Sequence, residues 1–393
     1  MHNIPLSIPN FEGNEKKYVD DAILQGWVST GGAYINKFEE QLQSFLGVPK
    51  VAAVQSGTSA LHLSLIECGV QPGDAVIVPA LTFIAAVNPV KYLFASPVFM
   101  DCDASLCIDP VKLRRFCENE CEFENDVLTL KTNGKQIKAI IVVHIFGNMA
   151  DMENIMNIAE QYHLKVVEDA TEALGTFYTA GKHSGRAAGT IGHFGAFSFN
   201  GNKIITTGGG GAVTSYAPEI SGHIKYLSTQ AKDDQVFYVH NEVGYNYRMT
   251  NVQAAIGVAQ MEELPEFINR KQDNYQKYRE LFEGFEYANL IGFRDGTSSN
   301  CWFYSLEINR KLIDTPLKEI INRLQEKGIQ TRAIWGLICE QKPYRNEIAY
   351  QIEQAPIYAE SIINIPSSTQ ISEDEIVLVA NEMKALLKEL AND

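Results

Sequence analysis

Short apolar segments alternate with helical segments through the first half of the chain, and this alternation limits the possible folds more than any other feature. Five segments have the length and composition of buried strands: 51–54, 75–78, 97–100, 137–143 and 165–167. Three segments between them have helical periodicity: 60–68, 84–94 and 152–162. Strands that are connected through helices run parallel and are covered on both faces. The sequence therefore predicts an α/β fold with a mainly parallel sheet.

The length of 393 residues predicts two domains. The last third of the chain mixes short strands with amphipathic helices. Strands are predicted at 300–309 and 330–334, and helices at 250–264, 266–285, 316–327 and 373–390. We expect a large domain over 1–250, with residues 1–30 able to pack outside it, and a smaller α/β domain over 251–393.

The net charge of −15 argues against a nucleic-acid or anionic-membrane partner. The first residues lack the basic and apolar regions of a signal peptide, and the uncharged run 76–90 is too short to span a bilayer. Seven cysteines without a CxxC pair suit reduced thiols. Cys117 and Cys121 could share a helix face, but nothing nearby completes a metal site. We expect a cytoplasmic protein with no metal.

Four side chains follow predicted strands at the edge where ligands bind in parallel sheets. Phe83, His144 and Asp169 fall at or just past strand ends, and Ser56 follows the strand 51–54. Ligands in such sheets lie beyond the carboxyl ends of the strands. These residues are therefore expected near a ligand.

The turn Ser56-Gly57-Thr58 joins a buried strand to a helix. Free amides at a helix N-terminus favour a phosphate, and hydroxyl groups add donors. The alternative is simple N-capping by Ser56 or Thr58. Both interpretations stay open from this segment alone.

Lys203 lies in the segment FGAFSFNGNKIITTGGGGAV, residues 194–213, between two predicted strands. Its neighbours Asn202, Ile204 and Ile205 suit an amine that is removed from water, which frees the nucleophilic lone pair. The alternative for any single lysine is a solvated surface charge. The four glycines that follow favour a tight turn more than a phosphate cradle.

A lysine in a turn, an acid at a strand end and a hydroxyl-lined phosphate turn together suit pyridoxal 5′-phosphate. Lys203 would form the Schiff base, and Asp169 would keep the pyridine nitrogen protonated. Phe83 is placed to cover one face of the ring. Taken singly, Asp169 could be a helix cap and Phe83 a core aromatic, but their joint placement favours the cofactor.

The chain resembles the DegT/DnrJ/EryC1/StrS sugar aminotransferases along nearly its whole length. The resemblance rests on five motifs: SGTSAL, PALTF, VVEDATEALG, FSFNGNKIITTGGGGA and GYNYRMTNVQAAIG. The openings PNFEGNEKKYV and WVSTGGAY are most similar to the branch that aminates UDP-4-keto-6-deoxy-N-acetylhexosamine, on the way to legionaminic acid and bacillosamine. The resemblance implies a fold type I, aspartate-aminotransferase-like subunit and a homodimer with shared active sites.

The resemblance also implies roles for individual residues. Lys203 matches the Schiff-base lysine, Asp169 the pyridinium partner, Phe83 the stacking aromatic, and Glu172 a position near the ring hydroxyl where many members have glutamine. The phosphate ligands implied are Ser56, Gly57, Thr58, Ser198 and, from the other subunit, Asn246. The substrate contacts implied are Thr30, Arg332 and Trp335. This chain departs from the family pattern at Gly209, where an acid is common, and at Cys339 and Glu340, where a histidine is usual.

The implied reaction is a transamination in two halves. L-Glutamate donates the amino group, and the C4 ketone of a nucleotide-linked sugar, expected to be UDP-2-acetamido-2,6-dideoxy-4-ketohexose, receives it. Alternatives are another keto sugar, GDP- or dTDP-linked, or a cyclitol. A sugar 3-dehydratase would need histidine in place of Lys203. A non-catalytic regulator that binds the cofactor would be supported by an appended DNA-binding domain, for which the acidic chain has no room.

Overall fold

The computed structural model describes residues 3–234 and 236–391. An eight-stranded sheet forms its centre, with the strand order β1-β10-β9-β7-β6-β2-β3-β15. These strands are β1 Lys50–Val54, β2 Ala75–Pro79, β3 Ser96–Met100, β6 Ile137–Val143, β7 Lys165–Asp169, β9 Phe194–Ser198, β10 Gly211–Ser215 and β15 Ile348–Tyr350. The strands from β9 to β15 pair in parallel, and β10 is antiparallel to both of its neighbours. The predicted mainly parallel sheet is confirmed.

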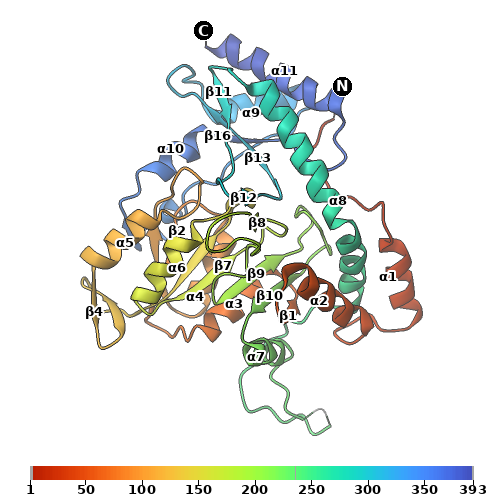
Figure 1. Cartoon of the computed structure of the whole chain (residues 1–393), viewed down its shortest axis with the longest axis vertical. Helices are drawn as coiled ribbons and strands as arrows, with labels where there is room; N and C mark the ends of the chain where they lie inside the picture. The colour runs from red at the N-terminus through yellow and green to blue at the C-terminus, as the bar shows by residue number, and fades with distance from the viewer. Residues whose placement is uncertain (1–2, 235, 392–393) are drawn as a thin grey trace.

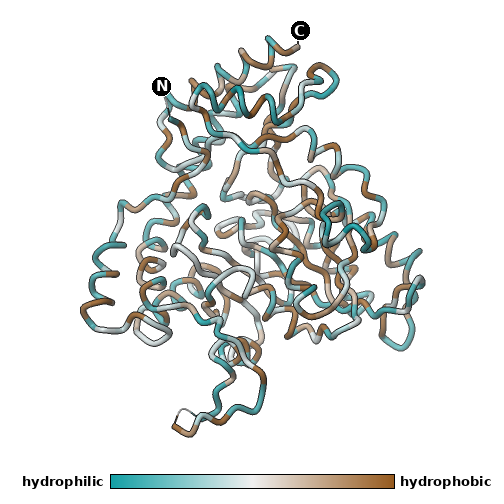
Figure 2. Tube along the Cα trace, turned by 180° about the vertical axis from the view of Figure 1, so that it is seen from behind, coloured by the Kyte–Doolittle hydropathy of each residue, from teal (hydrophilic) through white to brown (hydrophobic). Residues whose placement is uncertain are grey.

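Helices surround this sheet because its strands are apolar on both faces. The helices are α1 Glu15–Leu24, α2 Ala33–Leu46, α3 Gly57–Glu67, α4 Asn88–Tyr92, α5 Pro110–Asn119, α6 Met152–Gln161, α7 Pro218–Ser228, α8 Asn251–Phe282, α9 Leu317–Glu326, α10 Gln354–Ser361 and α11 Glu373–Leu390. Figure 2 shows apolar segments gathered inside the sheet region, whereas polar and apolar residues alternate along the outer helices. The loop after α7 projects away from the body of the molecule (Figure 1).

A second, four-stranded sheet has its own hydrophobic core. Its order is β11-β13-β16-β14, formed by β11 Ala288–Leu290, β13 Tyr304–Ile308, β16 Ile362–Ile365 and β14 Arg332–Ala333. That core draws on α8, α9 and α11, and it includes Ile4 from the start of the chain. Two short ribbons complete the strands: β4 Cys121–Glu124 with β5 Val127–Leu130, and β8 Phe177–Tyr178 with β12 Thr297–Ser298. We propose that the smaller domain begins within α8. Strand β15 lies in this later part of the chain but pairs with β3 in the large sheet.

Four predicted elements differ from the structure. The helix predicted at 84–94 is a short 3₁₀ turn, Ile84–Ala86, followed by α4, in which Pro89 occupies the first turn, where a missing N–H is tolerated. The two helices predicted at 250–264 and 266–285 are one helix, α8, that continues through Pro265. The strand predicted at 300–309 begins only at Tyr304, because Cys301 has a positive φ of 50°.

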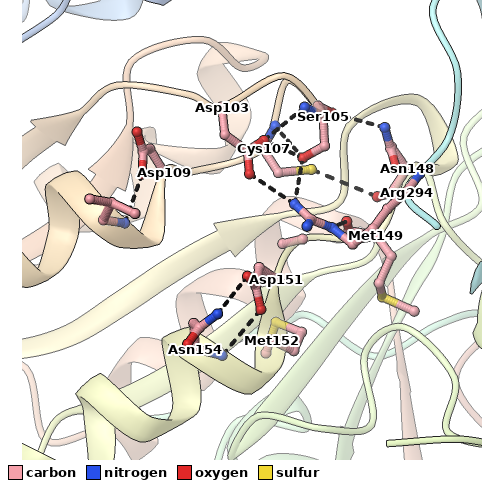
Figure 3. A network of polar contacts seen from close by, with 12 residues as sticks. Asp103, Ser105, Cys107, Asp109, Asn148, Met149, Asp151, Met152, Asn154 and Arg294 are labelled. Atoms are coloured by element: carbon pink, nitrogen blue, oxygen red, sulfur yellow. Dashed lines mark hydrogen bonds and ion pairs between the residues drawn. The ribbon is translucent and has the colours of Figure 1, made fainter. Parts of the chain in front are cut away.

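Arg294 ties the segment after β11 to the loops at one end of the large sheet (Figure 3). Its guanidinium donates to Asp103 Oδ2 at 2.8 Å, to Ser105 Oγ at 3.0 Å and to the Met149 carbonyl at 2.8 Å. Asp103 raises the pKa of Arg294 further, although burial opposes it. The two sheets are thus held together by charged hydrogen bonds as well as by the peptide chain.

Candidate active site

A cavity of about 380 Å³ lies past the carboxyl ends of the parallel strands and extends toward the four-stranded sheet. Most of the residues that the sequence singled out line it. They are Ser56, Gly57, Thr58, Phe83, Asp169, Glu172, Ser198, Lys203, Arg332 and Trp335. These side chains come from segments up to 279 positions apart (335 − 56), so the sheet edge gathers them as the strand-end argument predicts.

Lys203 lies in the connection between β9 and β10, where its N–H donates to the Asn200 carbonyl at 3.0 Å. Its side chain is only 13% exposed, which excludes the alternative of a solvated surface lysine. The Nζ atom lies 3.5 Å from Glu172 Oε1 and 4.3 Å from the centre of the Trp302 ring. A carboxylate and an aromatic face both attract an ammonium group. The side chain is therefore largely removed from bulk solvent, and it faces the cavity.

Glu172 is the acid closest to this amine. Burial raises the pKa of Glu172 to about 7, and Lys203 together with the N–H of Phe146, at 2.9 Å, opposes that rise. Phe146 can donate in this direction because its backbone is left-handed, with φ at 55°. Glu172 therefore changes its protonation near neutral pH, next to the amine.

Asp169 and Glu168 are consecutive acids at the end of β7 with opposite surroundings. Asp169 faces the cavity, accepts the Thr171 N–H at 3.1 Å, and has its pKa raised by burial. Glu168 points into the protein, where it accepts the N–H groups of Gly189, Ile191 and Gly192. Because successive side chains of a strand point to opposite faces, only Asp169 is available to a ligand.

His144, the other strand-end residue expected near a ligand, belongs to the buried side. Its Nδ1 accepts the Ala150 N–H at 3.1 Å, so Nε2 carries the ring proton and donates it to Glu168 at 2.8 Å. This hydrogen bond and those from backbone amides lower the pKa of Glu168, whereas burial opposes them. His144 is thus a structural residue, and its expected place in the site is corrected.

The first turn of α3 points at the cavity. Ser56 is the N-cap of α3, with its Oγ accepting the Ser59 N–H at 3.0 Å, so the capping interpretation holds for this residue. Gly57 and Thr58 follow it, at positions where N–H groups have no partner inside the helix. A Cβ on Gly57 would come within 2.9 Å of both Ser198 Cβ and Thr171 Cγ2. Only glycine leaves this end of the cavity open for an anion.

The glycine run after Lys203 shapes a turn. Gly208 and Gly210 have positive φ angles of 77° and 154°. A Cβ on Gly210 would lie 2.3 Å from Thr207 Oγ1. These angles and contacts fit the interpretation of this run as a turn.

The chain matches the model of the DegT/DnrJ/EryC1/StrS aminotransferase family over residues 9–384. The chain belongs to this family. It is therefore a pyridoxal phosphate-dependent aminotransferase, as the sequence predicts. EpsN of Bacillus subtilis (strain 168), whose name describes such an enzyme, is 35% identical over 95% of this chain and 94% of its own length.

A second sequence relative and a solved structure are also similar to this chain. A GDP-perosamine synthase of Caulobacter vibrioides is 33% identical, with 96% of each chain covered. Among solved structures, the aminotransferase TlmJ from Streptoalloteichus hindustanus is 25% identical and superposes with a TM-score of 0.87 over 99% of this chain and 100% of that chain. The predicted fold type I architecture is thus confirmed.

The residues present fit pyridoxal phosphate. The amides and hydroxyls at α3, with Ser198, form a donor set for its phosphate, and the space that a Cβ on Gly57 would fill stays open. Asp169 would hold the ring nitrogen, Lys203 the aldehyde carbon, and Phe83, which is 53% exposed, one face of the ring.

No helix in the described part of the chain is long and apolar enough to cross a membrane.

Two predicted site residues lie outside the cavity of their own chain. Thr30 is exposed in the loop before α2. Asn246 is exposed beside Gln230, whose Nε2 donates to Asn246 Oδ1 at 3.1 Å. The single chain therefore does not bring either residue to Lys203.

Three of the residues that line the cavity were not predicted from the sequence: Thr171, Phe146 and Trp302. Thr171 lies two positions after the strand-end acid Asp169 and could have been found from that position. Phe146 and Trp302 carry no such signal, because an aromatic residue in an apolar segment is usually part of a core.

Proposed function

We propose that this enzyme transfers the amino group of L-glutamate to the C4 ketone of a nucleotide-linked 4-keto-6-deoxy sugar. The single observation that carries this proposal is the cavity that gathers Lys203, Asp169 and the N-terminus of α3 below an exposed rim. Arg332 and Trp335 lie on that rim, and Arg332 is exposed, so a cation and an aromatic ring are available to a nucleotide.

Different residues of this chain have different roles in the proposed reaction. When bound, pyridoxal phosphate withdraws electrons from the carbon that loses or gains a proton. Lys203 Nζ takes the proton from Cα of the amino donor and returns a proton to C4 of the sugar. Glu172, whose Oε1 lies 3.5 Å from Nζ, pairs with the ammonium form of Lys203. Phe83 and Trp335, whose ring centres lie 6.3 Å apart, line the cavity side by side.

A UDP-linked N-acetylhexosamine is the sugar that we propose first. A relative from Campylobacter jejuni (serotype O:23/36, strain 81-176), named UDP-4-amino-4,6-dideoxy-N-acetyl-beta-L-altrosamine transaminase, supports it at 27% identity over 93% of each chain. A GDP-linked 4-keto-6-deoxy sugar is the second candidate, because the GDP-perosamine synthases from Caulobacter vibrioides and Escherichia coli O157:H7 are 33% and 32% identical.

A panel of 4-keto nucleotide sugars tests the proposal. The enzyme is mixed with L-glutamate and with UDP-, GDP- or dTDP-linked 4-keto-6-deoxy sugars, and α-ketoglutarate is measured. We expect the highest kcat/KM with the UDP-linked N-acetylated sugar. A higher value with the GDP-linked sugar selects the second candidate, and no α-ketoglutarate with any sugar would reject a sugar substrate.

Borohydride reduction tests the assignment of Lys203 separately from the substrate. We expect the reduced cofactor on the tryptic peptide that contains Lys203, and no label in Lys203→Ala. A labelled peptide that contains any other lysine would overturn the assignment.

We propose that the active unit is a homodimer in which Asn246 completes the cavity of the partner subunit. Support comes from the projecting loop before Asn246, which exposes Val236, Phe237, Tyr238 and Val243 by 67–84%. Mixing Lys203→Ala with Asn246→Ala restores one competent cavity in each mixed dimer, so we expect up to about a quarter of the wild-type activity. No recovery in demonstrably mixed dimers would overturn the shared cavity.

We propose a cytoplasmic location. All seven cysteines are free, and six of them are buried, which suits a reducing compartment. A fractionation that finds the protein outside the cytoplasm would overturn this location.

A further inference from the structure

Trp302 makes contacts in two directions at the junction of the two sheets. Its indole Nε1 donates to the Asn202 carbonyl at 2.7 Å, and its ring centre lies 4.3 Å from Lys203 Nζ. Asn202 directly precedes Lys203, so this hydrogen bond fixes the peptide that carries the amine. The ring also stacks on Phe303, with centres 4.0 Å apart and planes 17° apart. Trp302 is only 2% exposed, so these contacts are made away from water.

Lys271 fixes Trp302 from the opposite side. Its Nζ donates to the Trp302 carbonyl at 2.9 Å and to the Ser367 carbonyl at 2.5 Å. Ser367 Oγ also donates to the Trp302 carbonyl, at 3.2 Å. Asn300 Oδ1 accepts the Trp302 N–H at 3.0 Å. The backbone of Trp302 is therefore held at both its N–H and its carbonyl.

Lys271 is an unusual residue to bury. It is 3% exposed in α8, and within the described part of the chain no carboxylate lies at ion-pair distance from it. Burial lowers the pKa of Lys271 to about 7, and the nearby Cys301 opposes that shift. Burying an amine is unfavourable unless its N–H groups are bonded. Here the compensating bonds go to the backbone that carries Trp302.

We propose that Lys271 and Trp302 act together as positioning residues for Lys203, with Trp302 clamping the Lys203 turn and Lys271 holding Trp302 in place. This inference rests on the proposed role of Lys203. It adds a route by which the four-stranded sheet and α8 set the position of the amine. Neither residue needs to touch the substrate.

The test uses the purified holoenzyme and two single substitutions with their double variant. Trp302→Phe keeps an aromatic ring but loses the N–H to Asn202, and Lys271→Met keeps the length but loses the donor. Lys384→Met is the matched control, because Lys384 also donates to a backbone carbonyl of α8, that of Leu281, and has no hydrogen bond to Trp302. Melting temperatures of all variants report stability alone.

Two readouts report the position of Lys203 without using turnover. One is the dissociation constant of pyridoxal phosphate, from its visible absorbance. The other is the rate at which acetyl N-hydroxysuccinimide labels Lys203 in cofactor-free protein, by mass spectrometry. Loss of the hydrogen bond to Asn202 in Trp302→Phe, or of the one that holds the Trp302 carbonyl in Lys271→Met, should change each readout by about threefold to tenfold.

The comparison of the double variant with the two single variants tests whether Trp302 and Lys271 act together. We expect the double variant to match the more affected single variant, because both substitutions release the same clamp. Lys384→Met should leave both readouts unchanged even if it melts earlier. The inference is overturned if the two effects multiply, or if Lys271→Met changes only the melting temperature. Should Lys271→Met not fold, wild-type readouts in Trp302→Phe would still overturn it. A borohydride label on another lysine would instead reject the proposed function.

Discussion

The surroundings of Lys203 and of Lys271 show two ways in which a protein buries an amine. Lys203 sits in an irregular turn, faces a cavity and has Glu172 at 3.5 Å. Lys271 sits in the middle of a helix, is closed off from solvent and donates to two backbone carbonyls. An amine that reacts needs access and an acid that can exchange protons with it. An amine that only fixes backbone needs neither, so burial alone does not identify a catalytic lysine.

Removing each amine in turn is the strongest test of this difference. Lys203→Ala should lower kcat by at least about 10³-fold, because the base that moves the proton is lost. Lys271→Met should lower it by no more than about tenfold, since only positioning is lost. Single-turnover transamination with L-glutamate measures both. Equal losses in the two variants would erase the distinction.

The consecutive acids of β7 sharpen the same contrast between a cavity and a core. Asp169→Asn should lower kcat by about 10²-fold or more, because the charge that faces the cavity is lost. Glu168→Gln should instead reduce the free energy of unfolding by about 2–4 kcal/mol, because it places an amide against the N–H groups that Glu168 accepts. Kinetics and urea unfolding of both variants separate the two roles. An inactive but fully stable Glu168→Gln would contradict this assignment.

The pH dependence of stability reports the burial of Lys271. Its folded-state pKa is lowered to about 7, so between pH 7 and 10 the unfolded state binds more protons than the folded state. The unfolding free energy of the wild type should therefore rise relative to that of Lys271→Met by about 3 kcal/mol over this window. Urea unfolding of cofactor-free protein measures it. If the unfolding free energies of the wild type and Lys271→Met change with pH in parallel, Lys271 is not buried as described.

Glu172 should give the smallest change in unfolding free energy with pH, and the sign of this change is opposite to that for Lys271. Its folded-state pKa is raised to about 7, so its stabilising contribution is complete below pH 4.5 and is lost as the pH rises to 7. The wild type should lose about 2 kcal/mol relative to Glu172→Gln over that window. The same urea experiment measures this difference. A rise instead of a fall would show that the ionised form is favoured, through Lys203.

The cavity residues differ in how far they could be predicted from sequence. Asp169, Ser56, Gly57 and Thr58 follow buried strands, and the edge of a parallel sheet brings such positions together whatever the remaining sequence is. Lys203 could be singled out for the same reason, with the glycine turn marking the irregular backbone around it. His144 also follows a strand, but its side chain lies on the buried side. Its place was mispredicted because the position of a strand end does not reveal which way a side chain points.

Boundaries and long-range partners were less predictable. The single helix α8 was divided in the prediction, because Pro265 normally ends a helix. Trp302 was placed within a strand, whereas it lies in the loop before β13. Its partners Asn202 and Lys271 are 100 and 31 positions away. No local periodicity reports such contacts, since they depend on how two sheets meet.

The chemical groups, their order along the chain and the strand-helix alternation that brings them to one edge are all readable from the sequence. These features are local, because they depend on periodicity, turn residues and helix starts. The folded chain was needed to show that Glu172 approaches Lys203, that Trp302 is bonded to the adjoining peptide and that Thr30 and Asn246 lie outside the cavity. Burial, and with it the pKa of an acid or an amine, depends on neighbours from distant segments, which no local pattern reports.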